Sequence, residues 1–167
     1  LNEVTDLQRR NAKAVNFGIV YGISSFGLSQ DLSINRKEAE GYIQAYFEQY
    51  PKVKEFLDLT VENAEKDGYV TTLLKRRRVV LEINSSNYNI KEFGKRVAMN
   101  TPIQGSAADI IKLAMIKVND YIKQYQNDVK MICQIHDELL FEVKEDIVEK
   151  ISLDIKEIME NVIDNSD

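Results

Sequence analysis

The sequence predicts an α+β protein that is rich in helix and carries two antiparallel β-hairpins, the second with an acidic motif at its tip. Three observations support this class. Long segments without Gly or Pro place apolar residues at helical spacing. Two pairs of short apolar runs are each separated by only a few polar residues, which is typical of hairpins. The 167 residues, 44% of them hydrophobic, suit one domain or two small lobes that share a core.

The first part of the chain is predicted to be mainly helical. Gly22 ends the first helix, because glycine tolerates the left-handed conformation that closes many helices. Ser33 is the expected N-cap of the third helix. Pro51 begins the fourth helix and the Asp67-Gly68 pair ends it. The predicted helices cover residues 3–21, 25–32 (a short helical turn), 36–49 and 51–66.

The remainder of the chain is predicted to contain both hairpins and two further helices. The first hairpin turns near residues 74–77, and three polar residues, 136–138, form the tip of the second. Pro102 should kink or split the longer helix near Thr101, because proline lacks an amide hydrogen. The predicted elements are strands 69–74 and 78–83, a polar loop 84–89, helix 90–125, strands 129–135 and 139–143, and an amphipathic helix 145–162.

The charge is distributed unevenly, although the net charge is only −5. Residues 72–100 contain seven basic and two acidic side chains, whereas residues 137–167 contain eleven acidic side chains and three lysines. A chain divided in this way can present a basic face to a polyanion while its total charge is negative. The alternative, which we favour for the acidic end, is a solvated helix surface.

Cysteine use and hydropathy restrict the cellular context. Cys133 is the single cysteine, so a disulfide within the chain is excluded, and a reducing compartment, the cytoplasm, is predicted. No apolar run approaches the ~20 residues of a membrane span, and the N-terminus has no secretory signal. Because the chain does not begin with Met, we expect it to be a segment of a longer protein.

One group of candidate functional residues lies on the first predicted helix. Its members are spaced by four and form one slowly turning stripe: Arg9, Lys13, Phe17 and Tyr21. Cations bind phosphate oxygens, and aromatic rings offer flat faces to a base or sugar. The stripe therefore suits a nucleoside triphosphate. The alternative is a surface helix whose Phe17 and Tyr21 belong to the core.

A second group lies at the tip of the second predicted hairpin, where His136 precedes the adjacent acids Asp137 and Glu138. A hard cation such as Mg²⁺ needs carboxylate oxygens on a rigid frame, and a hairpin with buried strands supplies one. The single histidine has no Cys or His companions at suitable spacing, which excludes a zinc site. Cys133 is predicted to lie within a strand, which disfavours a nucleophilic Cys–His pair. The alternative is an ordinary acidic turn that favours solubility.

A third group, Arg96, Asn100 and Gln104, is again spaced by four and precedes the small residues 105–108. Arg, Asn and Gln side chains reach sugars and base edges in the minor groove of DNA. Small residues allow the close approach of a backbone or of DNA. The alternative is an N-cap cluster for a helix that begins near Ala107.

Together the three groups resemble DNA polymerases of family A, the bacterial DNA polymerase I type. Residues 9–22, RRNAKAVNFGIVYG, resemble motif B of that family, and residues 134–138, QIHDE, resemble motif C. Residues 96–109, RVAMNTPIQGSAAD, are similar to the segment between the two motifs. The order and spacing agree over nearly the whole chain, and the fourteen positions of motif B are highly specific.

The resemblance implies that residues 1–84 belong to the fingers of a polymerase. Arg9 and Lys13 would hold the triphosphate of the incoming nucleotide. Lys13 could also donate a proton to the departing pyrophosphate. Phe17 would pack on the nucleotide sugar, and Tyr21 would lie near the templating position.

Residues 85–167 would form part of the palm. Asp137 would bind the catalytic Mg²⁺, Glu138 would be an auxiliary acid nearby, and His136 would lie near the primer terminus. The side chains implied to contact the minor groove of the primer–template duplex are Arg96, Asn100 and Gln104. Arg77 and Arg78 match no motif and are expected only as phosphate contacts.

The implied reaction is attack of the primer 3′-hydroxyl on the α-phosphate of a deoxynucleoside triphosphate, assisted by two Mg²⁺ ions. In the family, a second metal-binding aspartate lies on the motif A strand, which we expect upstream of Leu1. The segment alone is therefore predicted to be inactive, and its exposed strand edges predict self-association. Two other hypotheses stay open from the sequence: a non-catalytic nucleic-acid-binding module, and a helical protein of structural or regulatory kind.

Overall fold

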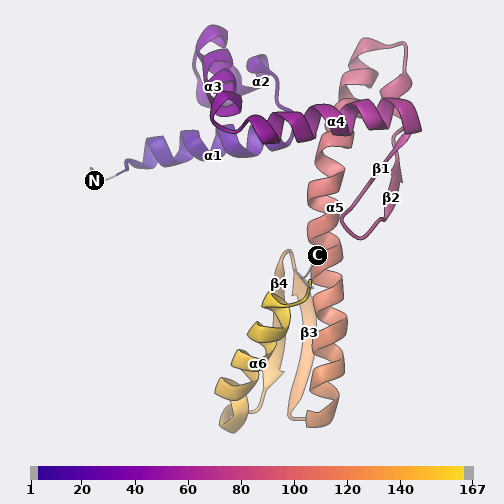
Figure 1. Cartoon of the computed structure of the whole chain (residues 1–167). Coiled ribbons are helices and arrows are strands. Elements are labelled where there is room, and N and C mark those ends of the chain that lie inside the picture. The colour runs from indigo at the N-terminus through magenta and orange to yellow at the C-terminus, as the bar shows by residue number, and fades with distance from the viewer. Residues whose placement is uncertain (1–3, 164–167) are drawn as a thin grey trace. The chain divides into compact units, whose positions relative to one another are not determined.

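The structure is a computed structural model that describes residues 4–163, and it confirms the predicted α+β class (Figure 1). Two compact units are present, an N-terminal unit (Leu1–Gly105) and a C-terminal unit (Ser106–Asp167). The α-helices are α1 (Asp6–Val20), α2 (Ser25–Leu32), α3 (Arg36–Gln49), α4 (Pro51–Asp67), α5 (Tyr88–Ile122) and α6 (Val148–Glu160). Strands β1 (Tyr69–Thr71) and β2 (Arg77–Val79) form one antiparallel sheet, and β3 (Val129–Ile135) and β4 (Glu138–Val143) form another.

Helices α1, α2 and α3 of the N-terminal unit each begin at a side-chain cap, and the cap of α3 differs from the prediction. Thr5 caps α1: its hydroxyl accepts the Gln8 amide hydrogen at 3.2 Å. The predicted start at residue 3 lies outside the described residues. Ser33 does not cap α3, because its left-handed φ of 56° serves to end α2. Asn35 caps α3 instead, and its side-chain oxygen accepts the Glu38 amide hydrogen at 2.9 Å.

The first hairpin is shorter than predicted. Strands were expected over 69–74 and 78–83, but β2 ends at Val79 and residues 81–84 form a 3₁₀ helix. The 3₁₀ turn carries Ile83 into the core, where it is fully buried. Burial of this side chain therefore favours a turn over a longer strand.

Helix α5 is continuous through Pro102, so the predicted split of this helix does not occur. Proline removes one backbone hydrogen bond from a helix interior. The neighbouring Thr101 hydroxyl donates to the carbonyl of Val97 at 2.7 Å. The last three residues of the predicted helix, 123–125, form a 3₁₀ turn.

Two apolar clusters hold the N-terminal unit together. One joins α1, α2 and α3, and the other joins α4, the β1–β2 hairpin, the 3₁₀ turn and the first part of α5. The buried residues of the first cluster are Leu28, Leu32 and Ala39, and those of the second are Ala64, Val70, Val80, Ile83 and Ala98. The second cluster matters for the site because it fixes the hairpin against α5.

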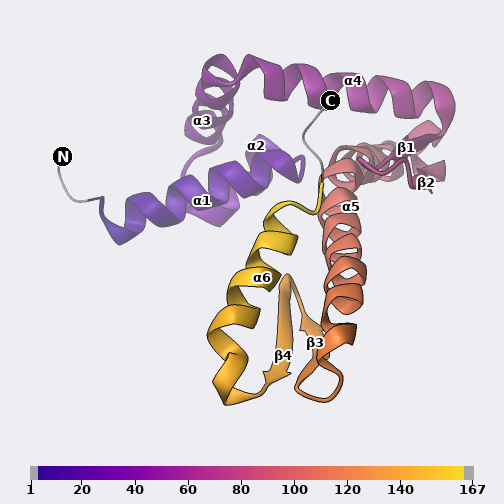
Figure 2. The same ribbon diagram turned by 60° about the horizontal axis from the view of Figure 1, so that its bottom comes forward.

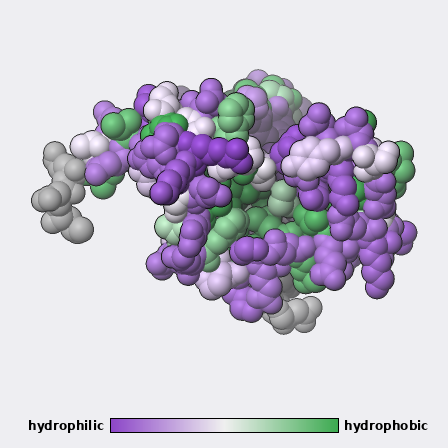
Figure 3. Space-filling view, turned by 90° about the horizontal axis from the view of Figure 1, so that it is seen from above, coloured by the Kyte–Doolittle hydropathy of each residue, from purple (hydrophilic) through white to green (hydrophobic). Residues whose placement is uncertain are grey.

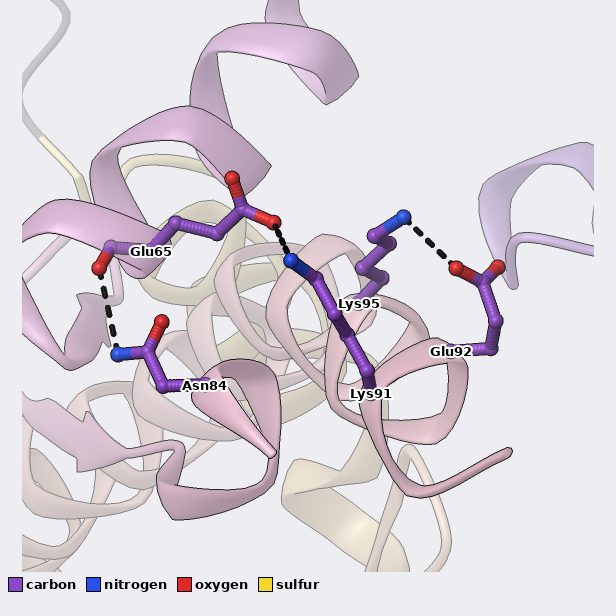
Figure 4. A network of polar contacts seen from close by, with 5 residues as sticks. All are labelled: Glu65, Asn84, Lys91, Glu92 and Lys95. Atoms are coloured by element: carbon purple, nitrogen blue, oxygen red, sulfur yellow. Dashed lines mark hydrogen bonds and ion pairs between the residues drawn. The ribbon is translucent and has the colours of Figure 1, made fainter. Parts of the chain in front are cut away.

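Polar contacts on the surface support the same packing (Figure 4). The Glu65 carboxylate pairs with Lys91 at 3.0 Å, and the Glu65 carbonyl accepts a hydrogen bond from the Asn84 amide at 3.3 Å. Within α5, the hydrogen bond from Lys95 to Glu92, 2.7 Å long, raises the pKa of Lys95. Such exposed pairs contribute only about 0–1 kcal/mol each. The Glu65–Lys91 pair is the contact of this group that joins α4 to the start of α5.

The C-terminal unit packs the second part of α5, the β3–β4 hairpin and α6 around one apolar core (Figures 1 and 2). Alternation along the strands turns Met131, Phe141 and Val143 toward this core. A β-bulge interrupts the pairing between Met131 and Cys133. The buried core residues are Val118, Ile122, Val129, Ile151 and Ile155.

A hydrogen-bonded chain links the end of α5 to α6. The Tyr121 hydroxyl donates to the Asp154 carboxylate, and the Lys150 ammonium donates to the Tyr125 hydroxyl at 2.9 Å. The two tyrosine hydroxyls are 2.9 Å apart. Burial and the Asp154 carboxylate raise the pKa of Tyr121, whereas Lys150 lowers the pKa of Tyr125.

Hydrophilic side chains dominate the face seen in Figure 3, with smaller apolar areas between them. Several large apolar residues nevertheless remain exposed, Leu81 and Tyr88 among the most.

Within residues 4–163, no helix combines the length and the apolar character needed to cross a membrane.

Candidate functional site

The predicted stripe on α1 is a row of exposed side chains. Lys13 Nζ lies 5.7 Å from the centroid of the Phe17 ring, and the Phe17 and Tyr21 rings stack at 6.2 Å. Phe17 is 50% exposed and Tyr21 is 40% exposed, so the alternative that both belong to the core is wrong. Ile19, which is buried, anchors the helix instead. Together with exposed Arg9, the row offers two cations and two rings to a ligand.

Gly22 allows the end of this row to approach α5. Its φ of +68° lies in the left-handed region, which disfavours side chains. A Cβ atom at this position would also lie 2.3 Å from Met99 Cε and 3.1 Å from Arg96 Cγ. Glycine is therefore required both by the backbone conformation and by the close approach, and it keeps neighbouring Tyr21 beside Arg96.

Tyr21 and the third predicted group line a common hollow of about 410 Å³ in the N-terminal unit. All three members of that group lie on the first part of α5, which is continuous past residue 107. The alternative of an N-cap cluster for a helix beginning at Ala107 is therefore wrong. The predicted residues that the structure brings together here are Tyr21, Arg96, Asn100 and Gln104.

Asn100 gives the hollow an unoccupied hydrogen-bond acceptor. Its Oδ1 atom is buried and has no hydrogen-bond partner among residues 4–163. A buried acceptor without a partner costs about 1–3 kcal/mol. The amide oxygen is thus suited to accept a hydrogen bond from a ligand that enters the hollow.

Two further residues of the hollow were missed as site residues. Phe93 lies one helical turn before Arg96, whose guanidinium carbon is 6.0 Å from the Phe93 ring centroid. Arg78 comes from β2 and had been expected only as a phosphate contact outside any motif. Two patterns in the sequence could have indicated them. Phe93 lies three residues before Arg96, so the two share a helix face, and alternation along a strand places Arg78 and Arg77 on opposite faces.

The acidic motif lies on a tighter turn than predicted. Only His136 and Asp137 connect the strands, because Glu138 belongs to β4 and pairs with Ile135. His136 has a left-handed φ of 55°, and its carbonyl accepts a hydrogen bond from the Gln134 side chain at 2.6 Å. The expectation of buried strands at this end is wrong. All of residues 132–138 are exposed, including Cys133 within β3.

The two carboxylates fit part of a Mg²⁺ site. Enzymes often bind Mg²⁺ through one or two carboxylates together with substrate phosphates and water. Asp137 and Glu138 are adjacent and exposed, but no group of three or more metal-ligating side chains occurs among the residues that the structure describes. A complete site would therefore need further ligands.

A second hollow, of about 490 Å³, lies in the C-terminal unit between β4 and α6. Its lining is largely apolar, with Phe141, Ile151 and Met159 among the contributors. It contains none of the predicted site residues. We therefore assign it no part in the chemistry.

Comparison with known proteins agrees with the resemblance seen in the motifs. The sequence profile of DNA polymerase family A matches residues 1–166. DNA polymerase I of Caldicellulosiruptor bescii is 53% identical over 164 residues, which cover 96% of this chain. DNA polymerase I of Bacillus subtilis is 51% identical over 162 residues, which cover 97% of this chain. The chain spans only 19% and 18% of these relatives, respectively.

A solved structure matches the fold as well. It is the POL domain of Pol1 from M. smegmatis in complex with DNA primer-template and dNTP. The TM-score is 0.92 at 44% sequence identity, and the match covers 97% of this chain and 29% of that chain. The profile, the relatives and this structure show that the chain belongs to DNA polymerase family A.

Proposed function

We propose that this chain is part of a DNA-directed DNA polymerase that extends a primer 3′-hydroxyl with deoxynucleotides. The observation that carries the proposal is the hollow in which Tyr21 meets Arg96, Asn100 and Gln104. Family membership favours a polymerase over a non-catalytic nucleic-acid-binding module. Because the chain spans about a fifth of its relatives, the activity is assigned to the longer protein.

In this proposal the α5 side of the hollow contacts the minor groove of the primer–template duplex. Residues spaced by four rise about 6 Å along a helix, close to two base steps of about 3.4 Å. Neighbouring members of the Arg96, Asn100 and Gln104 group can therefore follow the duplex. Guanidinium and amide groups hydrogen-bond the acceptors of the minor groove, and the free Asn100 oxygen suits the guanine amino group.

The α1 stripe is proposed to bind the incoming deoxynucleoside triphosphate. Arg9 and Lys13 would hold its phosphates, since a guanidinium and an ammonium both bind phosphate oxygens. Lys13 would also donate a proton to the leaving pyrophosphate. Phe17 would pack on the sugar and Tyr21 would lie near the templating base. The exposure of all four side chains on one side of α1 supports these roles.

Asp137 and Glu138 are the proposed Mg²⁺ ligands of this chain. When bound, Mg²⁺ supplies Lewis-acid stabilisation of the phosphoryl oxygens. The two carboxylates lie at the end of the β3–β4 hairpin, and the Gln134 hydrogen bond supports the turn beside them. His136 is proposed to lie near the primer terminus.

The division of labour is also proposed: residues 1–84 act as part of the fingers and residues 85–167 as part of the palm. The boundary between the compact units, at Gly105, differs because the first part of α5 packs with the β1–β2 hairpin.

We place the activity in DNA replication and repair and in the cytoplasm. Self-association of the isolated chain is proposed from exposed apolar residues of the second hairpin, Ile132, Ile135 and Leu140, and sedimentation would test it.

A chimera tests the proposed polymerase activity. This chain would replace the 162-residue matching segment of Bacillus subtilis DNA polymerase I. We expect Mg²⁺-dependent primer extension by the chimera and none by the 167-residue chain alone. A folded chimera that binds primer–template but adds no nucleotide would contradict the assigned function. Primer extension by the pure isolated chain would contradict the proposal that this chain alone lacks a complete metal site.

A further inference from the structure

The pairing register of the first hairpin separates two neighbouring arginines. Val70 pairs with Arg78, and Thr71 pairs with Arg77. Directly paired residues of antiparallel strands project from the same face, and successive residues project from opposite faces. Arg78 therefore shares a face with buried Val70, whereas Arg77 lies on the other face.

The face that carries Val70 packs against α5. Val70 belongs to the same buried cluster as Ala98 of that helix. Further along α5, a Cβ atom at Gly105 would lie only 2.6 Å from Thr72 Cγ2, so glycine permits the close approach of the hairpin. This packing places Arg78 at the hollow that Tyr21 and Arg96 also line.

Arg77 has a different environment. Its guanidinium carbon lies 5.1 Å from the centroid of the Tyr69 ring, on the face away from the hollow. Both arginines are exposed, and neither forms an ion pair in the part of the chain that the structure describes. The two side chains thus have the same charge and are neighbours in the sequence, but they lie on opposite faces of the hairpin.

The charged side chains that line the hollow are all basic. Arg78 and Arg96 both line it, and no carboxylate does so. Two cations close together repel each other unless an anion lies between or beside them. A guanidinium binds a phosphodiester through two parallel hydrogen bonds. The amides on the α5 side of the same hollow suit base edges instead.

We infer that Arg78 binds the phosphodiester backbone of the DNA strand whose base edges face Asn100 and Gln104. The inference rests on the proposed function and adds a positioning residue from outside the recognised motifs. It also makes the β1–β2 hairpin part of the DNA-binding surface on one face only. Arg77, on the opposite face, is not a DNA contact.

Binding of a fluorescein-labelled primer–template duplex to the chimera tests this inference, with fluorescence anisotropy measured over a series of salt concentrations. Loss of one phosphate contact lowers the slope of log affinity against log salt by about 1. We expect that change for Arg78→Gln, together with an affinity loss of about 10-fold at low salt. Arg77→Gln is the matched control and should change affinity less than about 2-fold. Arg78→Lys should keep the slope, because it keeps the charge, and should lose part of the affinity.

The outcomes separate this inference from the proposed function. If the unmodified chimera binds the duplex and Arg78→Gln behaves like Arg77→Gln, the assignment of Arg78 is wrong and the proposed function stands. An unchanged salt slope in Arg78→Gln would overturn the phosphate contact in the same way. If a folded, unmodified chimera does not bind the duplex even at low salt, the proposed function fails, and the inference that rests on it fails with it.

Discussion

The N-terminal unit and the C-terminal unit present their proposed functional groups in contrasting ways. In the first, Tyr21, Arg78 and Arg96 come from α1, the β1–β2 hairpin and α5, and they line one hollow. In the second, Asp137 and Glu138 lie at an exposed end of a hairpin, apart from the buried residues of the core. The first group is brought together by the packing of three elements, although its members are exposed, whereas the second group lies on a single hairpin.

This difference predicts different consequences of substitution. A hollow built by packing orients its side chains before a ligand arrives, so changes there should act mainly on DNA affinity. Carboxylates at the end of one hairpin lack such support from other elements and depend on the metal and on further ligands. Changes there should act mainly on turnover.

Asp137→Ala and Asn100→Ala in the chimera give the sharpest form of this contrast. For Asp137→Ala we expect turnover to fall at least about 1,000-fold, equivalent to about 4 kcal/mol in the barrier. Its affinity for primer–template should remain within about 2-fold, because the carboxylate is not part of the hollow. Asn100→Ala should instead weaken DNA binding, with a smaller loss of turnover. Steady-state kinetics and anisotropy on the same preparations measure both quantities, and the reverse pattern would refute the separation of roles.

Ile151→Ala should break the C-terminal core without opening the N-terminal unit. Ile151 is 1% exposed and belongs to the cluster that joins α5, β3 and α6. Truncation of such a side chain costs about 2–5 kcal/mol. Hydrogen exchange should show lost protection in β3, β4 and α6 while α2 and α3 keep theirs. Leu153→Ala, on the same helix but 67% exposed, is the control and should change stability by less than about 0.5 kcal/mol.

Gly22→Ala should destabilise the N-terminal unit by about 1–2 kcal/mol, since alanine resists the left-handed backbone conformation. The added methyl group would also force Met99 to move. Gly41→Ala is a suitable control, because position 41 is helical and a Cβ there would contact nothing within 4 Å. That change should stabilise α3 by about 0.5–1 kcal/mol. Thermal unfolding of both variants measures the difference, and equal stability would rule out the proposed constraint at Gly22.

Alkaline pH should affect the C-terminal unit through Tyr121. Burial and the hydrogen bond to Asp154 raise the pKa of Tyr121 in the folded state. Its contribution to stability is therefore complete below about pH 10, the pKa in the unfolded chain, and is lost as the pH rises toward the folded pKa. The raised pKa of Lys150 acts in the same direction. Tyr125 opposes them, because Lys150 lowers its pKa.

Tyr121→Phe isolates this effect, which is the smallest of the four. Urea unfolding at pH 8 and pH 11 should show a smaller loss of stability with pH in the variant than in the unmodified chain. The variant should also be less stable at pH 8 by about 1 kcal/mol, because a hydrogen bond is lost. An equal or larger pH-dependent loss in Tyr121→Phe would show that other groups control the alkaline response.

Local patterns predicted much of this fold correctly. Helix α4 has almost its expected bounds, because Pro51 and Gly68 act on their own neighbours. The stripe on α1 follows directly from helical periodicity. The errors have more than one cause. Packing buries Ile83 on a 3₁₀ turn, whereas the left-handed backbone of Ser33 ends α2 and leaves Asn35 as the local cap of α3. Helix α5 continues through Pro102 without the predicted split.

Family membership was accessible from the order of amino acids in residues 9–22, 96–109 and 134–138. The candidate residues on each helix face were accessible because side chains repeat along a helix at a fixed spacing whatever surrounds it. The hollow was not accessible in that way. Tyr21, Arg78 and Arg96 are far apart along the chain, and only the packing of three elements unites them. Whether such residues meet depends on side-chain volumes and on glycines such as Gly22 and Gly105, which permit close approach. These effects arise from contacts between elements that are distant in the sequence, so a local sequence pattern does not reveal them.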